Sequence, residues 1–461
     1  MKLLAPFKPT ASDPWDVAKA AHLCRRAGFG APRKEVEKVL ELGPEGAVER
    51  FLHVDPQRDE EYRKLFEMNQ RGFIQFQAPQ MLQAWWLFRM QNDPFPLREK
   101  MTLFWHGHFA TSFHKVEDMR MMHEQNETLR RGALGDFRDL VLNVSRDPAM
   151  IRWLDNQENF KEHPNENFAR ELMELFTLGE GHYTEHDVRE ATRAFTGWHL
   201  REQKFFFDAD AHDFGRKKVL GHTGRFDGRD VVDILLQEDQ AKRYLARKII
   251  EFFVMPEPSE ALVAEAADVL TRCNLEMRWF MRALFQSKAF YSPEAYRSKI
   301  KSPVEFSVGA VRDLDGVFPG QELAELTHGM GQELFAPPSV KGWDGERDWI
   351  ASNAWLVRGQ FAENFSHAGA EFNLGSSLPL ETHVPFEESD PQIYVDYYLD
   401  RLVQGEVSPE TRQELRDYMT RLDEFNDEDA EEGFRREIDF RVYKIRGLIR
   451  LILTLSEYHL C

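Results

Sequence analysis

The sequence has few cysteines and no pattern that would put them to use. Cys24, Cys273 and Cys461 are the whole set, and they lie far apart in the chain. Their odd number and spacing fit neither a disulfide framework nor a CxxC metal motif. We therefore expect a reducing compartment, and we predict a cytoplasmic location.

Long apolar runs are also absent. The most apolar window, residues 445–455, is interrupted by Arg446 and Arg450 and is too short to span a bilayer. Near the N-terminus, Pro6 and Pro9 occur before an apolar signal segment could form. These features predict a soluble protein that has no signal peptide and no membrane as a partner.

Positive charge is in short supply. The 461 residues include 59 Lys and Arg against 78 Asp and Glu, which gives a formal net charge of −19. An acidic surface repels phosphate backbones, so we expect no nucleic-acid partner. No P-loop, GxGxxG or GxSxG motif occurs in the strand–turn–helix setting that such motifs need, which disfavours nucleotide-binding and serine-hydrolase sites.

Helical periodicity dominates what is present. Leu97, Met101, Phe104 and His108 recur at the spacing of one helix face. Residues 205–228 differ, because short β-prone runs alternate there with turn glycines. We predict a mainly α fold, a multi-helix globular array with a small β-hairpin insertion around residues 205–228.

The domain organisation follows from composition. Residues 375–391, which include Ser376, Ser377 and Pro379, have the composition of an exposed linker. We predict a main helical domain at residues 1–374, which contains the β insertion. Residues 375–461 are predicted to form a C-terminal helical segment packed on the same core.

A polar stripe follows the predicted helix at residues 164–179. Glu166, Arg170 and Glu174 recur at i,i+4 spacing, with Glu171 beside them. On a solvated face these groups would form ordinary ion pairs worth about 0.2–0.5 kcal/mol each. In a cleft, burial could raise the pKa of a carboxyl for acid–base work. Spacing does not separate the two interpretations, and Glu166, Arg170 and Glu171 are candidate catalytic residues.

His106 and His108 form an HxH pair. Two such imidazoles share a side only in extended backbone, whereas on a helix they lie about 200° apart. A site for Zn, Fe or Mn would need further ligands from elsewhere in the chain. We take both histidines as candidate ligands of a divalent metal, with one core and one surface or capping histidine as the alternative.

Two loop clusters complete the candidates. His212 beside Asp213 is typical of an oriented general base, and equally of an Asp turn that closes a hairpin. Lys341 and Trp343 follow the stiff Pro337-Pro338 pair, and such loops line pockets or simply cross over a core tryptophan. We treat Lys341 and Trp343 as pocket candidates.

Several of these segments occur in a familiar order. They are residues 22–30 (HLCRRAGFG), 100–112 (KMTLFWHGHFATS), 164–198 (PNENFARELMELFTLGEGHYTEHDVREATRAFTGW) and 334–345 (LFAPPSVKGWDG). Together they resemble the bacterial family catalogued as domain of unknown function 1800. The resemblance implies a bacterial, mostly helical protein and carries no established activity. It also implies a protein partner, because members often lie beside genes for a sulfatase-like family, domain of unknown function 1501.

Two functional hypotheses follow. The first is an enzyme, hydrolytic or oxidative, with a pocket of His, carboxylate and Arg groups and with or without a divalent metal. It requires His106 or His108 to lie near Glu166 or Asp213. The second is a non-catalytic helical accessory protein of a neighbouring enzyme, which would expose an apolar patch of more than a few hundred Å².

Overall fold

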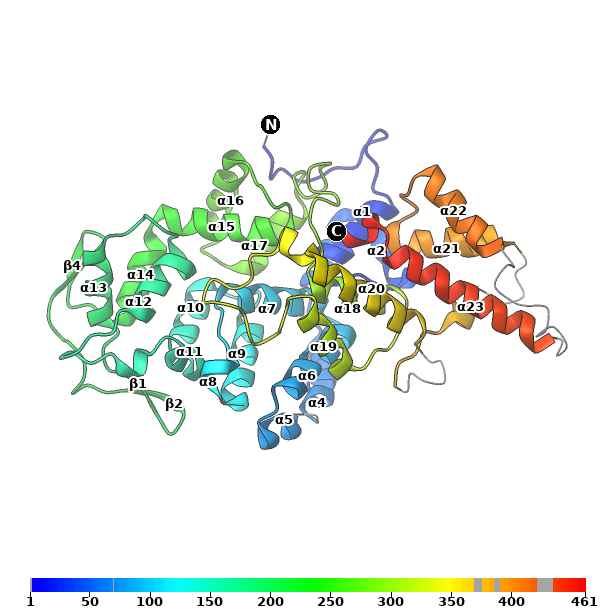
Figure 1. Ribbon diagram of the computed structural model, residues 1–461. Coiled ribbons are helices and arrows are strands. Elements are labelled where there is room, and N and C mark those ends of the chain that lie inside the picture. Colours follow the sequence, from blue (N-terminus) through cyan, green and yellow to red (C-terminus); the bar gives the residue numbers. More distant parts are fainter. Residues whose placement is uncertain (1, 69, 369–374, 385–389, 421–433) are drawn as a thin grey trace.

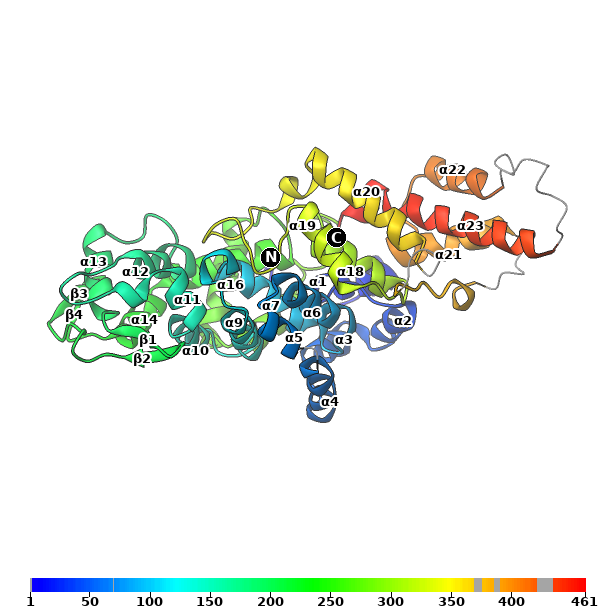
Figure 2. The ribbon, with the colours of Figure 1, turned by 60° about the horizontal axis from the view of Figure 1, so that its bottom comes forward.

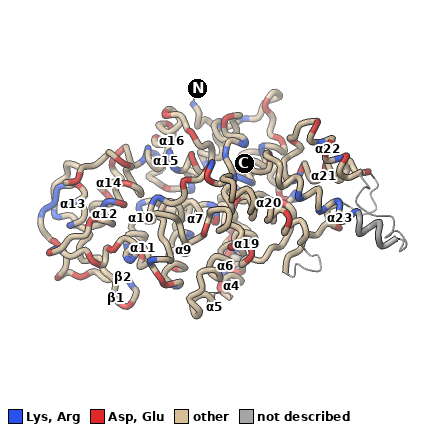
Figure 3. Tube along the Cα trace, viewed as in Figure 1, with Lys and Arg blue, Asp and Glu red and all other residues tan. Residues whose placement is uncertain are grey.

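Helices make up most of the protein, which confirms the predicted mainly α fold (Figure 1). The computed structural model describes residues 2–68, 70–368, 375–384, 390–420 and 434–461. Within these ranges, no helix combines the length and the apolarity needed to cross a membrane. Basic and acidic residues are interspersed along the described part of the trace (Figure 3).

The N-terminal half begins with helices joined by short loops. These are α1 (Val17–Arg26), α2 (Arg33–Glu41), α3 (Gly43–Leu52), α4 (Pro56–Glu67), α5 (Gln70–Phe76), α6 (Pro79–Asn92), α7 (Pro96–His108), α8 (Phe113–Val116), α9 (Met119–Gly132), α10 (Phe137–Ser145) and α11 (Pro148–Trp153), followed by a 3₁₀ turn at Asn156–Glu158. Their boundaries follow capping rules. Asp147, for example, accepts a hydrogen bond from the backbone N–H of Met150 (3.1 Å), and Pro148 occupies the first helical position.

The middle of the chain contains the β insertion. The elements of this middle part are α12 (Asn167–Glu171), a π-helix (Leu172–Thr177), α13 (Glu185–Ala194), β1 (Trp198–Arg201), β2 (Lys204–Phe207), β3 (Lys217–Val219), β4 (His222–Gly224), α14 (Gly228–Gln237), α15 (Asp239–Phe253), α16 (Glu260–Arg272) and α17 (Met277–Phe285). The hairpins lie at one end of the elongated molecule, with β3–β4 beside α13 and β1 beside α11 (Figure 1).

The insertion consists of two antiparallel hairpins, β1–β2 and β3–β4. The Phe205–Phe207 run therefore pairs with residues 198–201, which lie outside the predicted range. Its turn residues, Glu202 and Gln203, have φ values of 51° and 62° without being glycine. Such a turn carries no glycine signal, and this explains why the first hairpin was missed.

The C-terminal part is helical again. It comprises α18 (Pro303–Asp313), α19 (Gly320–Gly329), α20 (Ser352–Ser366), α21 (Pro391–Val403), α22 (Pro409–Thr420) and α23 (Phe434–Leu453), with 3₁₀ turns at Glu346–Ile350, Leu380–Thr382 and Ser456–His459. Figure 2 shows α21, α22 and α23 together at the end of the molecule opposite the hairpins. In the predicted linker, the described Leu378, Leu380 and Val384 are buried, so this part is packed rather than exposed.

Two apolar cores meet at α7. The first is formed mainly by α1, α3 and α10–α17, and the second by α6, α18–α21 and α23. Neighbouring residues of α7 face different cores, since Phe104 belongs to the first and Leu103 to the second. The C-terminal half of α7 thus lies at a junction between two packed bodies, a common place for a cavity.

Candidate functional site

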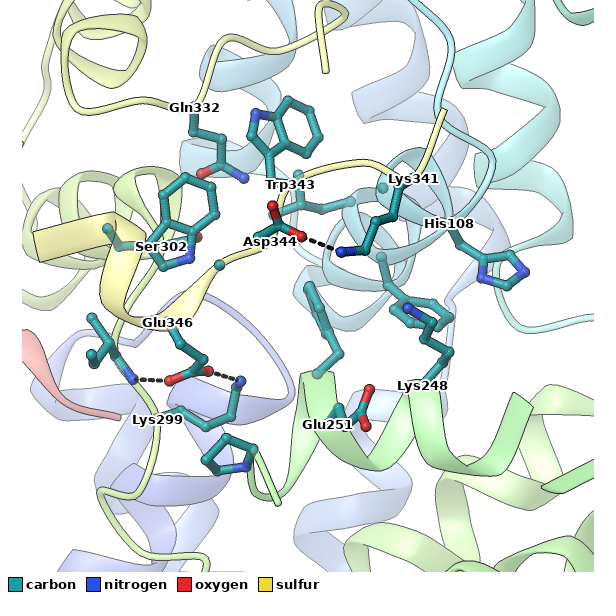
Figure 4. A pocket seen from close by; sticks show the side chains of 18 of the residues that line it. His108, Lys248, Glu251, Lys299, Ser302, Gln332, Lys341, Trp343, Asp344 and Glu346 are labelled. Carbon is teal, nitrogen blue, oxygen red and sulfur yellow. Dashed lines mark hydrogen bonds and ion pairs between the residues drawn. The ribbon is translucent and has the colours of Figure 1, made fainter. Parts of the chain in front are cut away.

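A cavity of about 280 Å³ lies at this junction. Its wall is built mainly from four segments that are distant in sequence: the end of α7, the middle of α15, residues 299–305 and residues 341–349. Leu175, Pro256 and Gln332 complete it. Figure 4 shows Lys248 and Glu251 rising from α15 toward the loop that carries Lys341, Trp343 and Asp344. Aromatic side chains form much of the wall, among them Phe104, Tyr244, Phe252, Trp343 and Trp349.

The π-helix borders this cavity through its backbone. A π-turn leaves carbonyl groups near the helix end free for side-chain donors. The Tyr244 hydroxyl donates to the carbonyl of Leu175 (2.9 Å), and His108 Nε2 donates to the carbonyl of Phe176 (3.0 Å). The chain segment around the predicted 164–179 helix therefore holds two cavity residues, His108 and Tyr244, in fixed orientations.

A second set of bonds holds the loop after α19 against α7. The backbone N–H of Phe335 donates to His106 Nε2 (3.0 Å), and the carbonyl of Phe335 accepts from the N–H of Phe113 (2.9 Å). Phe335 has φ +62° and packs its ring against His106. This anchor fixes where the 341–349 segment begins to cover the cavity.

Most charges around the cavity are neutralised by pairing. Three ion pairs have N–O distances of 2.5 Å: Lys341–Asp344, Lys299–Glu346 and Lys100–Glu305. Glu305 is largely buried, with 11% of its side chain exposed, and Lys100 holds the pKa of its carboxyl at about 2 against the opposing effect of burial. These pairs fix the loop and the floor of the cavity.

Lys248 and Glu251 take part in none of these pairs. They lie three residues apart on α15, and both line the cavity. Within the described residues, neither side chain makes a hydrogen bond or an ion pair, although the Lys248 ammonium lies 5.8 Å from the centroid of the Tyr244 ring. Burial raises the pKa of Glu251 above its ordinary value, while Lys248 acts in the opposite direction. The cavity thus contains one cation and one carboxyl that form no hydrogen bond or ion pair within the described residues, although they act on each other electrostatically.

His106 and His108 lie on different sides of α7. His106 packs against Trp86 and Phe335, whereas His108 packs against Phe104 and Phe176. Burial lowers the pKa of each imidazole to about 3, so both are neutral. The Nε2 atom of each ring is already used in a hydrogen bond, and His108 of the two lines the cavity.

A metal site would need more ligands than these two imidazoles provide. In the part of the chain that the structure describes, no group of three or more His, Cys, Asp or Glu side chains could hold a metal ion. The assignment of His106 and His108 to one metal stays a prediction from sequence.

Glu166, Arg170 and Glu171 lie outside the cavity lining. Arg170 forms ion pairs with Glu166 (3.0 Å) and with both carboxylate oxygens of Glu185 (2.7 Å) at the surface. Glu174 instead accepts a hydrogen bond from the Tyr183 hydroxyl. Burial, together with Glu174, raises the pKa of Glu171. The Glu166–Arg170 contact matches the ordinary i,i+4 pairing considered above.

His212 and Asp213 point to different partners. The His212 ring lies between Phe207 and Phe214, and its Nδ1 donates to the carbonyl of Thr196 (2.7 Å). Asp213 pairs with Arg193 (2.7 Å) and accepts from the N–H of Gly215 (2.7 Å), which is an Asp turn. Neither residue lines the cavity, and within the described ranges no hydrogen bond, ion pair or ring contact joins this cluster to His106, His108 or Glu166.

Lys341 and Trp343 do line the cavity, whereas Lys248, Glu251 and Tyr244 were not singled out from sequence. A signal for the missed residues was present. Tyr244, Lys248 and Glu251 recur at four and three residues, which is the spacing of one helix face. A polar stripe of this kind is so common on exposed helices that its spacing alone does not mark a cavity.

The comparisons with known proteins give a family without an activity. The model of the family described as "Protein of unknown function (DUF1800)" matches residues 22–460, nearly the whole chain. This match confirms the resemblance seen in the sequence. No curated protein and no solved structure matches the chain.

Proposed function

We propose that this protein, which belongs to the DUF1800 family of proteins of unknown function, is an enzyme that hydrolyses a small polar molecule in the cavity between α7 and α15. One observation carries the proposal. Glu251 is a half-buried carboxyl in the cavity with no hydrogen-bond or ion-pair partner among the described residues. Structural carboxylates of the same cavity, such as Glu305, are paired.

The protonation of Glu251 suits acid–base work. Burial raises the pKa of its carboxyl above the ordinary value, while Lys248 acts in the opposite direction. A carboxyl in a cavity that no other side chain engages is free to exchange a proton with a substrate. Glu251 is therefore the proton-transfer residue that we propose.

Hydrolysis is the reaction class that the neighbouring groups favour. It requires an acid–base group and a water molecule, both held beside the substrate. Lys248 supplies a positive charge one helical turn from Glu251, which can orient an anionic group of the substrate. His108 Nδ1 carries a lone pair, because Nε2 holds the proton donated to Phe176.

The proposal is tested by measuring whether the wild-type protein and a matched pair of variants convert small metabolites. The purified protein is incubated with a mixture of small metabolites, and mass spectrometry follows which compounds disappear and which appear. We expect Glu251→Gln to slow the conversion by about 100-fold or more, as is typical when an acid–base group is removed. Asp239→Asn is the control, since Asp239 lies on the same helix with its side chain fully exposed.

Asp239→Asn should retain the wild-type rate. Circular dichroism of both variants should match that of the wild type, because neither residue belongs to a core. Full activity in Glu251→Gln, or no conversion by the wild type, would overturn the proposal.

Exposed apolar side chains on α20 favour a second candidate function, that of a non-catalytic accessory protein. Leu356 is 72% exposed and Trp355 is 45% exposed, close in sequence to Ile350 at 38%. Exposed apolar residues that gather on one face commonly mark a protein interface. The test is co-purification with a protein of the sulfatase-like family named above, where Leu356→Glu should abolish an association that Leu42→Glu leaves intact.

A further inference from the structure

We infer that the cavity binds an α-amino acid, free or as the end of a larger substrate, with its carboxylate at Lys248 and its amino nitrogen at Glu251. The inference rests on the proposed function in using the same cavity, and it concerns the chemical class of the ligand. Binding can be measured without turnover, so the two proposals can fail separately.

The first argument is charge balance. Three ion pairs account for the other charged groups of the lining and leave one ammonium and one carboxyl unpaired. A ligand with a single charge would satisfy one of them and leave the other without a partner in a partly desolvated site, which is costly. A ligand with one charge of each sign satisfies both.

The second argument is spacing. Lys248 and Glu251 are three residues apart on α15, so their Cβ atoms are about 5–6 Å apart on the same helix surface. An α-amino acid carries its carboxylate and its amino group on a single carbon. Two such close groups can reach two side chains that are one helical turn apart, whereas a ligand with distant charges cannot.

The third argument is size and wall chemistry. The cavity of about 280 Å³ is slightly smaller than the roughly 300–1,000 Å³ usual for drug-sized ligands. Phe104, Tyr244 and Trp343 offer aromatic surface beside the charged pair. An apolar or aromatic ligand side chain would pack against these rings and gain both burial and ring contacts.

This orientation agrees with hydrolysis of an amide. The amide nitrogen carries no charge, so Glu251 enters the step protonated, and the ion pair with Glu251 forms only with the free amino acid. The hydroxyl of a water molecule adds to the acyl carbon, the C–N bond breaks, and the nitrogen takes the proton of Glu251. The remaining proton of the water restores Glu251, so no further reactant is needed. The product that stays at Lys248 and Glu251 is the amino acid.

Calorimetric titration of the full chain tests the ligand class. The twenty standard amino acids are titrated first. We expect those with apolar or aromatic side chains to bind. For phenylalanine, the matched probes are phenethylamine, which lacks the carboxylate, and 3-phenylpropionate, which lacks the amino group. Each probe should bind about tenfold more weakly or worse, because it loses one ion pair.

Two variants test which side chain binds the carboxylate of the ligand and which binds its amino group. Lys248→Met should bind phenylalanine and phenethylamine equally, and Glu251→Gln should bind phenylalanine and 3-phenylpropionate equally. Lys242→Met is the control, because Lys242 lies on α15 outside the cavity lining and should leave all three affinities unchanged.

Three results would overturn the inference: no binding of any amino acid at 10 mM (about 2.7 kcal/mol of affinity), equal binding of all three phenylalanine probes to the wild type, or discrimination that survives in both variants. Amino-acid binding without any turnover would contradict the proposed hydrolysis and support the inferred ligand class. Turnover of substrates that lack the amino-acid group would support hydrolysis and contradict the inferred ligand class.

Discussion

The imidazole of His106 accepts a hydrogen bond from the backbone N–H of Phe335, with 3.0 Å between the two nitrogens and 229 residues between them in the chain. An accepting Nε2 requires the proton to lie on Nδ1, so the ring is neutral in one tautomer. This single bond joins α7 to the loop that covers the cavity. Anchoring of this loop therefore accounts for the first histidine of the HxH pair, His106.

Replacement of His106 by Leu should destabilise the fold. The N–H of Phe335 is buried and would lose its acceptor, which costs about 1–3 kcal/mol in the free energy of unfolding. Urea unfolding followed by tryptophan fluorescence measures the change. His114→Leu is the control, because the His114 side chain is 66% exposed and its removal should change the free energy by less than about 0.5 kcal/mol. Equal stability of the two variants would show that the bond to Phe335 contributes nothing.

Stability should fall as the pH decreases from about 6.5 to 4. Several buried histidines have folded pKa values far below the ordinary 6.5, so the unfolded chain binds more protons in this range. Each such histidine makes the free energy of unfolding fall by about 1.4 kcal/mol per pH unit. The residues are His106, His108 and His459 at about 3 and His123 and His383 at about 4.

Buried carboxyls act in the opposite direction. Burial raises the pKa of Asp147 to about 7 and that of Asp313 to about 6, so these groups bind protons in the folded state first and add stability as the pH falls. Burial also raises the pKa of Asp93. The histidines with pKa values of about 3 to 4 outnumber the carboxyls whose pKa values reach 6 or 7, and the net change is a loss. Urea midpoints at pH 7 and pH 5 test this, and a midpoint that is unchanged or higher at pH 5 would contradict it.

The sequence predicted what depends on local periodicity. The apolar spacing of Leu97, Met101 and Phe104 placed α7. It did not predict the π-helix, in which the Thr177 hydroxyl and the Leu178 N–H donate to carbonyls five residues back. That geometry depends on packing, because the same residues also fit a regular helix.

The cavity could not be assembled from the sequence, because its charged groups come from segments that share no motif. Lys248 on α15 and Lys299 before α18 look alike as isolated lysines, yet Lys299 is paired with Glu346 and Lys248 is not. The difference depends on which loop folds over which helix. Trp343 was a candidate because the rigid loop around it carries a local signal.

The buried carboxylate of Glu99 should be more important for stability than any surface pair. It is fully buried and accepts hydrogen bonds from Trp86 (3.0 Å), Arg89 (2.9 Å) and Arg130 (2.6 Å). Glu99→Leu would leave two guanidinium groups buried with one partner fewer, at a cost of about 3–5 kcal/mol.

Glu60→Leu provides the comparison for Glu99. Glu60 pairs with Arg63 on an exposed face of α4, where solvent screens an ion pair and its contribution to stability is small. Thermal unfolding of both variants ranks the effects. A smaller loss for Glu99→Leu than for Glu60→Leu would show that the buried network does not stabilise the fold.

Gly342 and Gly331 separate backbone strain from cavity geometry. Both have φ values that L-residues rarely adopt, +89° and +99°, so Ala at either position should cost a similar strain of about 1–2 kcal/mol. At Gly342 a Cβ would lie 2.5 Å from the carbonyl oxygen of Gly107, whereas at Gly331 nothing lies within 4 Å. Gly342→Ala must therefore also move the loop away from α7, and with it Lys341 and Trp343. We expect the two variants to unfold at similar urea concentrations. We expect Gly342→Ala alone to weaken binding of the cavity ligand by about tenfold or more, which is equivalent to about 1.4 kcal/mol. Equal affinities in the two variants would mean that the position of the 341–349 loop does not shape the site.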